Sequence, residues 1–229
     1  GAIHFRYMGL EVSMNLKKIL AAAVLFSAMT IGAMAKNHPY GMDIAVSPFG
    51  VETSTLEWKV GNITVDNKEV GINLFALKIN TYICPWLDNH LGIYGSFGIL
   101  PGVHVADNAD NASFVVGAEF MVGPAFGIDL GDSSVRFQVS TPFHLLLGGG
   151  KTYRANANVE QDYFIDAFGM GITPQFRFGA DKRCSFVAGM DFVFDFAGNC
   201  KIGNTWADPD SFFRFAWTPY LGLGINFGD

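Results

Sequence analysis

Single charged residues interrupt strongly apolar stretches in the second half of the chain. Arg136 lies within VRFQVS and Arg214 within FFRFAW, while Asp191 and Asp195 stand four residues apart in GMDFVFDFAG. A charge taken out of water is stable only when it is paired or hydrogen-bonded. The pattern therefore predicts a buried network of ionised side chains, which can serve as an ion-pair plug, as a polar constriction in a solute path, or in proton transfer.

The members of this network follow from residue parity along the expected strands. The arginines are expected to meet acids, because no other basic residue in the strands is assigned the inward face. His144 can titrate near neutrality, but a single histidine is more often a hydrogen-bonded interior residue, so no catalytic residue is predicted. The predicted lumen-lining polar network comprises Glu119, Asp129, Arg136, His144, Arg177, Asp191, Asp195 and Arg214, with Asp43 and Gln138 on the same face and with Asp191, Asp195, Glu119 and Asp129 as the chief partners of the arginines.

The segment PGVHVADNADNAS over residues 101–113 offers oxygen atoms that suit calcium. Its Asp107 and Asp110, flanked by Asn108 and Asn111, lack the glycine and terminal glutamate of an EF-hand loop. Asn and Asp are also ordinary turn-forming residues. We predict no metal site and no cofactor.

The same segment holds His104, Asp107 and Ser113, the residue types of an acyl-transfer site, but nothing orders them into a nucleophile and its base. Residues 148–152 read GGGKT without the G-x-x-x-x-G-K frame of a phosphate-binding loop. No G-x-S-x-G elbow is present. We predict that the chain is not an enzyme.

The chain has three cysteines, Cys84, Cys184 and Cys200, without a C-x-x-C pair, so neither a disulfide framework nor a zinc site is implied. We expect Cys84 in the first short turn, Cys184 in the third, and Cys200 at the opposite rim. A strand of about 13 residues spans about 40 Å, which is too far for a Cys184–Cys200 disulfide.

Composition restricts the class of protein. The chain of 229 residues is 50% hydrophobic and 16% charged, with 22 Phe, 27 Gly and a net charge of -6. The apolar content excludes wholesale disorder, and the acidic balance argues against nucleic-acid binding. Either a very well buried globule or a protein with a lipid-facing surface fits.

Residues 14–35 have the features of a cleaved signal peptide. Met14 begins a basic region with Lys17 and Lys18, an apolar run covers 19–31, and Ala33-Met34-Ala35 is a small-x-small cleavage site. Residues 1–13 precede the expected start and are interpreted as an upstream extension that is not native. Residues 36–229 then form the exported domain.

Apolar and polar residues alternate with a period of two throughout that domain, which is typical of strands with two different faces. Most of the segments reach the 9–11 residues that a tilted strand needs to cross a bilayer. Eight are expected, near 40–49, 68–82, 91–100, 114–129, 134–147, 163–179, 185–197 and 212–227.

The connections between these segments alternate in length. Those near 50–67, 101–113, 148–162 and 198–211 are long and rich in Asn, Asp, Gly and Thr, and those near 83–90, 130–133 and 180–184 are short. Outer-membrane barrels have long extracellular loops and short periplasmic turns. Four long and three short connections match eight strands with both termini in the periplasm.

The two faces of the strands differ in bulk. One carries large apolar residues such as Phe192, Phe194, Phe215 and Leu223, and the other carries glycine beside isolated charges. Eight strands enclose little more than side chains, so that many Phe residues do not fit inside. The sequence therefore predicts an all-β fold: an eight-stranded antiparallel transmembrane β-barrel with a polar lumen, long extracellular loops and lipid around its apolar face.

The leader is followed by eight alternating strands and the closing segment Tyr220–Phe227. In these features the chain resembles the small outer-membrane barrels of OmpW, OmpA and OmpX type. The resemblance is greatest to the OmpW-like group, which includes spirochaetal proteins. Its last aromatic is Phe227, with Gly228 and Asp229 beyond it, which departs from the usual terminal signal. We expect a monomer in the bacterial outer membrane, and the resemblance to OmpW implies a narrow pore for small solutes, including hydrophobic ones. The alternative is a closed structural or surface-interaction barrel whose loops contact host or envelope partners.

Overall fold

The computed structural model describes residues 2–7, 10–15, 40–60, 63–106, 112–131, 134–153, 160–203, 205–207 and 209–227. The chain divides into two compact units, residues 1–38 with Asp229, and residues 39–228. The regular structure of the described residues is all β-strand. Among them, no helix is long and apolar enough to cross a bilayer.

The first unit contains one antiparallel hairpin, in which β1 (Ala2–Tyr7) pairs with β2 (Leu10–Asn15). The predicted leader over 14–35 lies almost wholly outside the described residues. The leader therefore stays a prediction, and so does the interpretation of residues 1–13 as an upstream extension that is not native.

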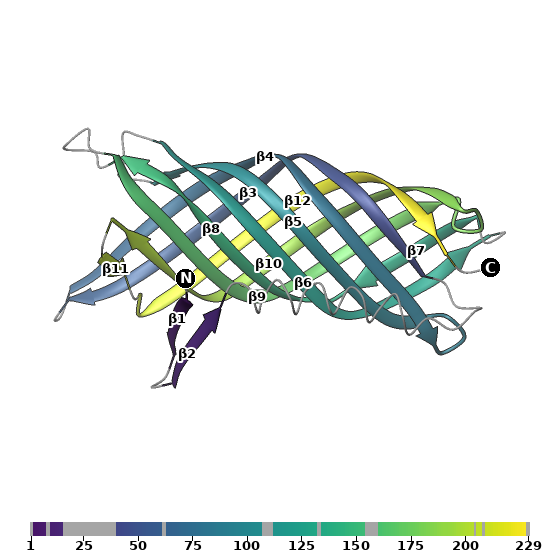
Figure 1. The fold of residues 1–229 in the computed structure, drawn as a ribbon, viewed down its shortest axis with the longest axis horizontal. Coiled ribbons are helices and arrows are strands. Elements are labelled where there is room, and N and C mark those ends of the chain that lie inside the picture. The colour runs from purple at the N-terminus through teal and green to yellow at the C-terminus, as the bar shows by residue number, and fades with distance from the viewer. Residues whose placement is uncertain are drawn as a thin grey trace. The chain divides into compact units, whose positions relative to one another are not determined.

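The second unit is a closed antiparallel ring (Figure 1). Each crossing segment pairs with the next along the chain, and the last, β12, pairs back with β3. Closure leaves no unpaired strand edge within the membrane, where an unpaired backbone group costs several kcal/mol. The predicted eight-stranded barrel is thus confirmed for the described residues, which cross in β3 (Tyr40–Val60), β4 (Ile63–Trp86), β5 (Leu91–Ala106), β6 (Ala112–Leu130), β7 (Val135–Ser140) with β8 (Phe143–Tyr153), β9 (Glu160–Phe178), β10 (Cys184–Ile202) and β12 (Ser211–Asn226), while the short β11 (Thr205–Ala207) pairs with the end of β10.

Strands β7 and β8 together make one crossing of the barrel, interrupted at Thr141 and Pro142. The N–H of Thr141 donates to the carbonyl oxygen of Pro124 at 3.0 Å, and the N–H of Gly171 donates to that of Pro142 at 2.7 Å. On the neighbouring strand, a Cβ at Gly123 would lie 2.5 Å from Cα of Pro142. Glycine is therefore required where the interrupted strand approaches β6.

The strands extend well beyond the lengths expected from the sequence. β3 has 21 residues and β4 has 24, against the 9–11 needed to cross a bilayer. Much of the chain expected as long connections, at 50–67, 101–113, 148–162 and 198–211, is therefore strand, because the alternation continues: Glu52 and Ser54 are buried while Val51 and Thr53 are exposed. The polar composition of these segments indicates hairpin arms outside the membrane rather than irregular loops.

The outer surface of the barrel is apolar. Phe194 is 39% exposed and Leu223 is 72% exposed, and Phe192 and Phe215 share their outward parity and are partly exposed. Soluble proteins do not expose so continuous an apolar surface, whereas a barrel in lipid does. The side chains of opposite parity are buried and largely polar, as predicted for the lumen.

Two opposed bulges change the parity of β3 and β4. Ser47 pairs with Ala76 and Phe49 with Leu74, so Pro48 and Phe75 stand opposite each other. Phe75 has a φ of 54° and is 74% exposed, a left-handed conformation that is rare for an aromatic residue. The register toward β12 and toward β5 shifts by one residue at the same level, as a bulge produces.

The paired bulges decide which residues of these strands point inward. In β3 the inward side chains have odd numbers up to Ser47 and even numbers from Gly50 onward. In β4 they change from odd to even between Asn73 and Ala76. As a result Glu52 and Lys78 both face the interior.

Candidate functional site

The centre of the barrel interior contains a network of ionised side chains. Nζ of Lys78 lies 2.8 Å from Oε1 of Glu119 and forms a second ion pair with Asp191. Asp191 also accepts a hydrogen bond of 2.9 Å from the hydroxyl of Thr173. Lys78 is fully buried, as a lysine in a protein interior can be only when it is paired.

Arg214 bridges two carboxylates in the same layer. Its Nη1 donates to Oδ2 of Asp195 at 2.7 Å and its Nη2 donates to Oε2 of Glu52 at 2.5 Å. Glu52 also accepts a hydrogen bond of 3.0 Å from the side-chain amide of Asn73 and lies 3.1 Å from Nε2 of His104. Arg214 is 1% exposed, so its charge is balanced by protein groups alone.

His144 joins the two halves of this network. Its Nδ1 is 2.6 Å from Oδ1 of Asp195, and its Nε2 is 3.3 Å from Oε2 of Glu119. Glu119 belongs to the lysine pair and Asp195 to the arginine pair, so the imidazole completes a continuous chain of contacts from Lys78 to Arg214.

Glycines on the intervening strands let these charges meet across two strands. Gly98 of β5 pairs with both Lys78 and Glu119, and Gly169 of β9 pairs with both His144 and Asp195. In each of these rows of three paired residues, the glycine in the middle has no side chain. The long polar side chains on either side can therefore extend over the glycine and contact each other. The same arrangement places Gly71 between Glu52 and His104.

At the short-turn end of the barrel, Arg177 forms a second buried cluster. Its Nη2 contacts Oδ1 of Asp43 at 2.5 Å, and its Nη1 donates to Ser185 at 2.6 Å and to Asn226 at 3.0 Å. The guanidinium carbon lies 4.5 Å from the ring centroid of Tyr82, a cation–π contact. Arg177 thus pairs with Asp43 and not with the four acids expected as the chief partners.

Arg136 lies at the same end of the barrel. Its Nη1 donates to Oδ1 of Asp129 at 2.9 Å, across directly paired positions of β6 and β7, and its Nη2 donates to the backbone carbonyl of Asn89. The side chain of Asp129 is 43% exposed, so this acid stands at the rim rather than in the buried lumen.

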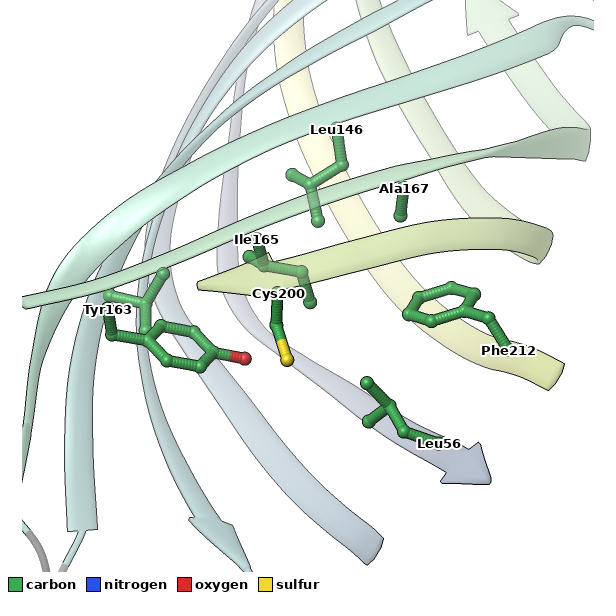
Figure 2. Close-up of a cluster of buried hydrophobic side chains, with 8 residues drawn as sticks. Leu56, Leu146, Tyr163, Ile165, Ala167, Cys200 and Phe212 are labelled. Atoms are coloured by element: carbon green, nitrogen blue, oxygen red, sulfur yellow. The ribbon is translucent and has the colours of Figure 1, made fainter. Parts of the chain in front are cut away.

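At the long-hairpin end, a cluster of buried apolar side chains lies in the interior. Figure 2 shows the cluster converging from several strands of the barrel. Its members are at most 7% exposed. They are Leu56, Val115, Leu146, Tyr163, Ile165, Ala167, Cys200 and Phe212.

Four residues of the central network were not predicted from the sequence: Lys78, Glu52, Asn73 and His104. The statement that no basic strand residue besides the arginines faces inward was wrong, because the bulge at Phe75 turns Lys78 into the lumen. Glu52 and His104 were assigned to loops that are strand. The continued alternation through residues 50–57 was the available signal.

A small cavity lies beside Arg214. It is lined on one side by Glu52, Asn73 and His104 and on the other by apolar side chains such as Leu100. The volume that the centre of a water molecule can occupy in this cavity is about 10 Å³. The cavity therefore has room for about one water molecule.

The three cysteines are free. Cys184 is exposed at the start of β10, and Cys200 is buried near the other end of that strand. The prediction that Cys84 lies in the first short turn was wrong: it is fully buried in β4, and the turn covers residues 87–90. Cys84 faces inward because the bulge at Phe75 also sets its parity.

The weaker motifs do not assemble into a site among the described residues. The possible calcium ligands Asp107, Asn108, Asp110 and Asn111 lie outside them. His104 pairs in register with Ser113, but its Nε2 faces Glu52. The GGGKT segment lies on β8, where no phosphate-binding turn forms.

A closed antiparallel ring with an apolar exterior and an interior of paired charges defines a small transmembrane β-barrel of the outer-membrane type. No family model matches the sequence, and no curated protein matches it significantly. The fold is similar to that of the outer membrane protein OprG from Pseudomonas aeruginosa, with a TM-score of 0.59 and 11% identity over 84% of this chain and 99% of that one.

Two further barrels are similar at lower TM-scores. The outer membrane protein AlkL has a TM-score of 0.46 and 11% identity over 86% of this chain and 94% of that one. The outer membrane protease OmpT from Escherichia coli has a TM-score of 0.45 and 7% identity over 86% of this chain and 100% of that one. At these identities the likeness concerns the fold alone.

Proposed function

We propose that this protein is a closed outer-membrane barrel that acts through its extended hairpins and not by conducting solutes. One observation carries the proposal: the ion network fills the centre of the interior, with Lys78 fully buried and Arg214 1% exposed. The apolar cluster at the long-hairpin end adds a second closure. A polar conducting path would leave such charges hydrated.

The length of the hairpins supports the same function. The outward side chains of β3 are apolar at Phe49 and Val51 and polar at Thr53 and Glu57, while Lys68 is exposed on β4. This change marks the upper limit of the lipid-facing band. The arms beyond it project into water on the extracellular side, where they are available to host or envelope partners. With this orientation the short turns face the periplasm. We assign no catalytic residue, metal, cofactor or nucleic acid to this monomer.

Conductance in planar lipid bilayers tests the proposal. The full chain should insert without conducting, whereas a Lys78→Ala/Arg214→Ala variant should show openings because the two permanent cations of the network are gone. A porin in the same bilayers controls for detection, and heat-modifiable migration on a gel controls for folding. Discrete openings of the wild-type chain would overturn the proposal and favour the narrow pore for small or hydrophobic solutes that the OmpW resemblance implies.

A further inference from the structure

Both ring nitrogens of one buried histidine face carboxylate oxygens. Nδ1 of His144 lies 2.6 Å from Asp195 and Nε2 lies 3.3 Å from Glu119. The imidazole is 1% exposed, and Nε2 is buried without any hydrogen-bond partner of good geometry. The ring is therefore shielded from bulk solvent, and the two carboxylates are the groups that most directly affect its protonation.

A neutral imidazole does not fit this position. It carries one N–H and one lone pair, so one nitrogen would direct its lone pair at a carboxylate. Each of the two acids also has a fixed cation, since Lys78 lies 2.8 Å from Glu119 and Arg214 lies 2.7 Å from Asp195. A carboxylate that pairs with a cation in this way accepts hydrogen bonds and does not donate one to the ring.

The charge count of the surrounding groups points the same way. Four acids face two permanent cations in the central network, and β9 adds only the neutral Gly169 and Thr173. A cationic His144 reduces the surplus of negative charge. The charged and titratable groups of this network are Glu52 on β3, Lys78 on β4, His104 on β5, Glu119 on β6, Asp191 and Asp195 on β10 and Arg214 on β12, with Tyr94 and Tyr220 nearby.

We propose that His144 is a proton-binding site, and that the bound proton links the lysine pair to the arginine pair and so keeps the interior closed. Loss of the proton to solvent converts the imidazolium to neutral imidazole and leaves a lone pair against a carboxylate. The two halves of the network then repel each other at this contact. The inference rests on the proposed function, because it describes what holds a closed barrel shut.

Nitrogen NMR of the full chain in lipid bilayers, with labelled histidine, measures the proton directly. At pH 7.5 both ring nitrogens of His144 should be protonated, although a free histidine titrates near pH 6.5. The signal is assigned by its loss in His144→Gln. A ring with one unprotonated nitrogen at pH 7.5 would overturn the proposal. If His144→Gln does not assemble, single Gln substitutions of the other four histidines, His4, His38, His90 and His104, assign their signals, and the signal of His144 follows by difference.

The pH dependence of unfolding gives a second readout. Above pH 6.5 the unfolded chain loses the histidine proton while the folded barrel keeps it, so unfolding releases one proton. Between pH 7 and 8.5 the unfolding equilibrium constant of the wild-type chain should rise about tenfold more per pH unit than that of His144→Gln. His90→Gln is the matched control, because the ring of His90 contacts backbone carbonyls in an exposed turn; it should keep the wild-type slope. Equal slopes for wild type and His144→Gln would contradict the bound proton.

Failure of this inference differs from failure of the proposed function. A silent barrel with a neutral His144 removes the proton site and leaves the closed barrel standing. A conducting barrel with a cationic His144 removes the closed barrel and leaves the proton site standing.

Discussion

His144 and Asp195 are in contact although their strands are not neighbours. His144 of β8 pairs with Gly169 of β9, and Gly169 pairs with Asp195 of β10, so all three residues lie in one row across the sheet. The imidazole crosses the glycine to reach the carboxylate at 2.6 Å. The interior network thus depends on where side chains are missing as much as on where charges occur.

Alanine at Gly169 should break this row. A Cβ there would lie 2.0 Å from the carbonyl oxygen of Phe194 and 2.6 Å from Oδ1 of Asp195, and backbone cannot move away cheaply. We expect Gly169→Ala to lower the free energy of unfolding by more than about 3 kcal/mol, or to block assembly. Gly98→Ala is the control, because its Cβ would meet only side-chain ends, no closer than 3.3 Å, and should cost about 1 kcal/mol or less. Urea unfolding in lipid vesicles measures both, and equal costs would contradict the argument.

Arginine at Phe194 should be poorly tolerated because Phe194 faces lipid. Phe194→Arg near the bilayer midplane is expected to cost about 2–4 kcal/mol in the free energy of folding into vesicles. Phe227 is 46% exposed and lies beyond the end of β12, and Phe227→Arg should cost about 0–1 kcal/mol, as at the interface. A harmless Phe194→Arg would place this surface outside the lipid.

Removal of the Arg214 guanidinium should leave Glu52 and Asp195 as buried charges without that cation. We expect Arg214→Ala to lower the free energy of unfolding by about 3–5 kcal/mol, as for one partner of a buried pair. Adding Glu52→Gln to this variant should recover part of the loss, because one uncompensated charge is then neutral. If the double variant is no more stable than Arg214→Ala, Glu52 does not bear the cost.

The cysteines should differ in reactivity because only Cys184 is exposed. The sequence predicted Cys200 at the rim opposite Cys184, but Cys200 is 4% exposed within the apolar cluster. With the short turns in the periplasm, intact cells should remain unlabelled, and permeabilised cells should gain one label at Cys184. Mass spectrometry counts the labels. Labelling of Cys184 in intact cells would invert the topology.

Much of the barrel follows from the sequence because a strand in lipid has only two faces. Alternation places Phe194 and Leu223 outside and Asp191 and Asp195 inside, since an apolar side chain gains from lipid and a charge does not. The pairing of Arg214 with Asp195 also follows from parity on neighbouring strands. The two faces and the Arg214–Asp195 pair can be predicted without knowing how strands that are not neighbours are aligned.

Residues on strands with bulges were not predictable in the same way. A bulge shifts parity by one residue, and its position depends on how β3 and β4 fit between β12 and β5. On β3 Pro48 interrupts the strand pattern, and on β4 the apolar alternation changes phase between Leu74 and Leu77, but neither feature says how the bulges fit against β12 and β5. Lys78 and Glu52 were therefore missed even though their residue types suit the network.

The sequence by itself determined the ring, its two faces and the need to pair interior charges, because these depend on local alternation and on the cost of burying charge. Only the tertiary structure decided the partners: Lys78 with Glu119 and Asp191, Arg177 with Asp43, and His144 between two acids. The physical reason is that each contact joins strands whose relative register is set by the closure of the whole barrel. A shift of one residue in any strand turns its charges from the lumen to the lipid.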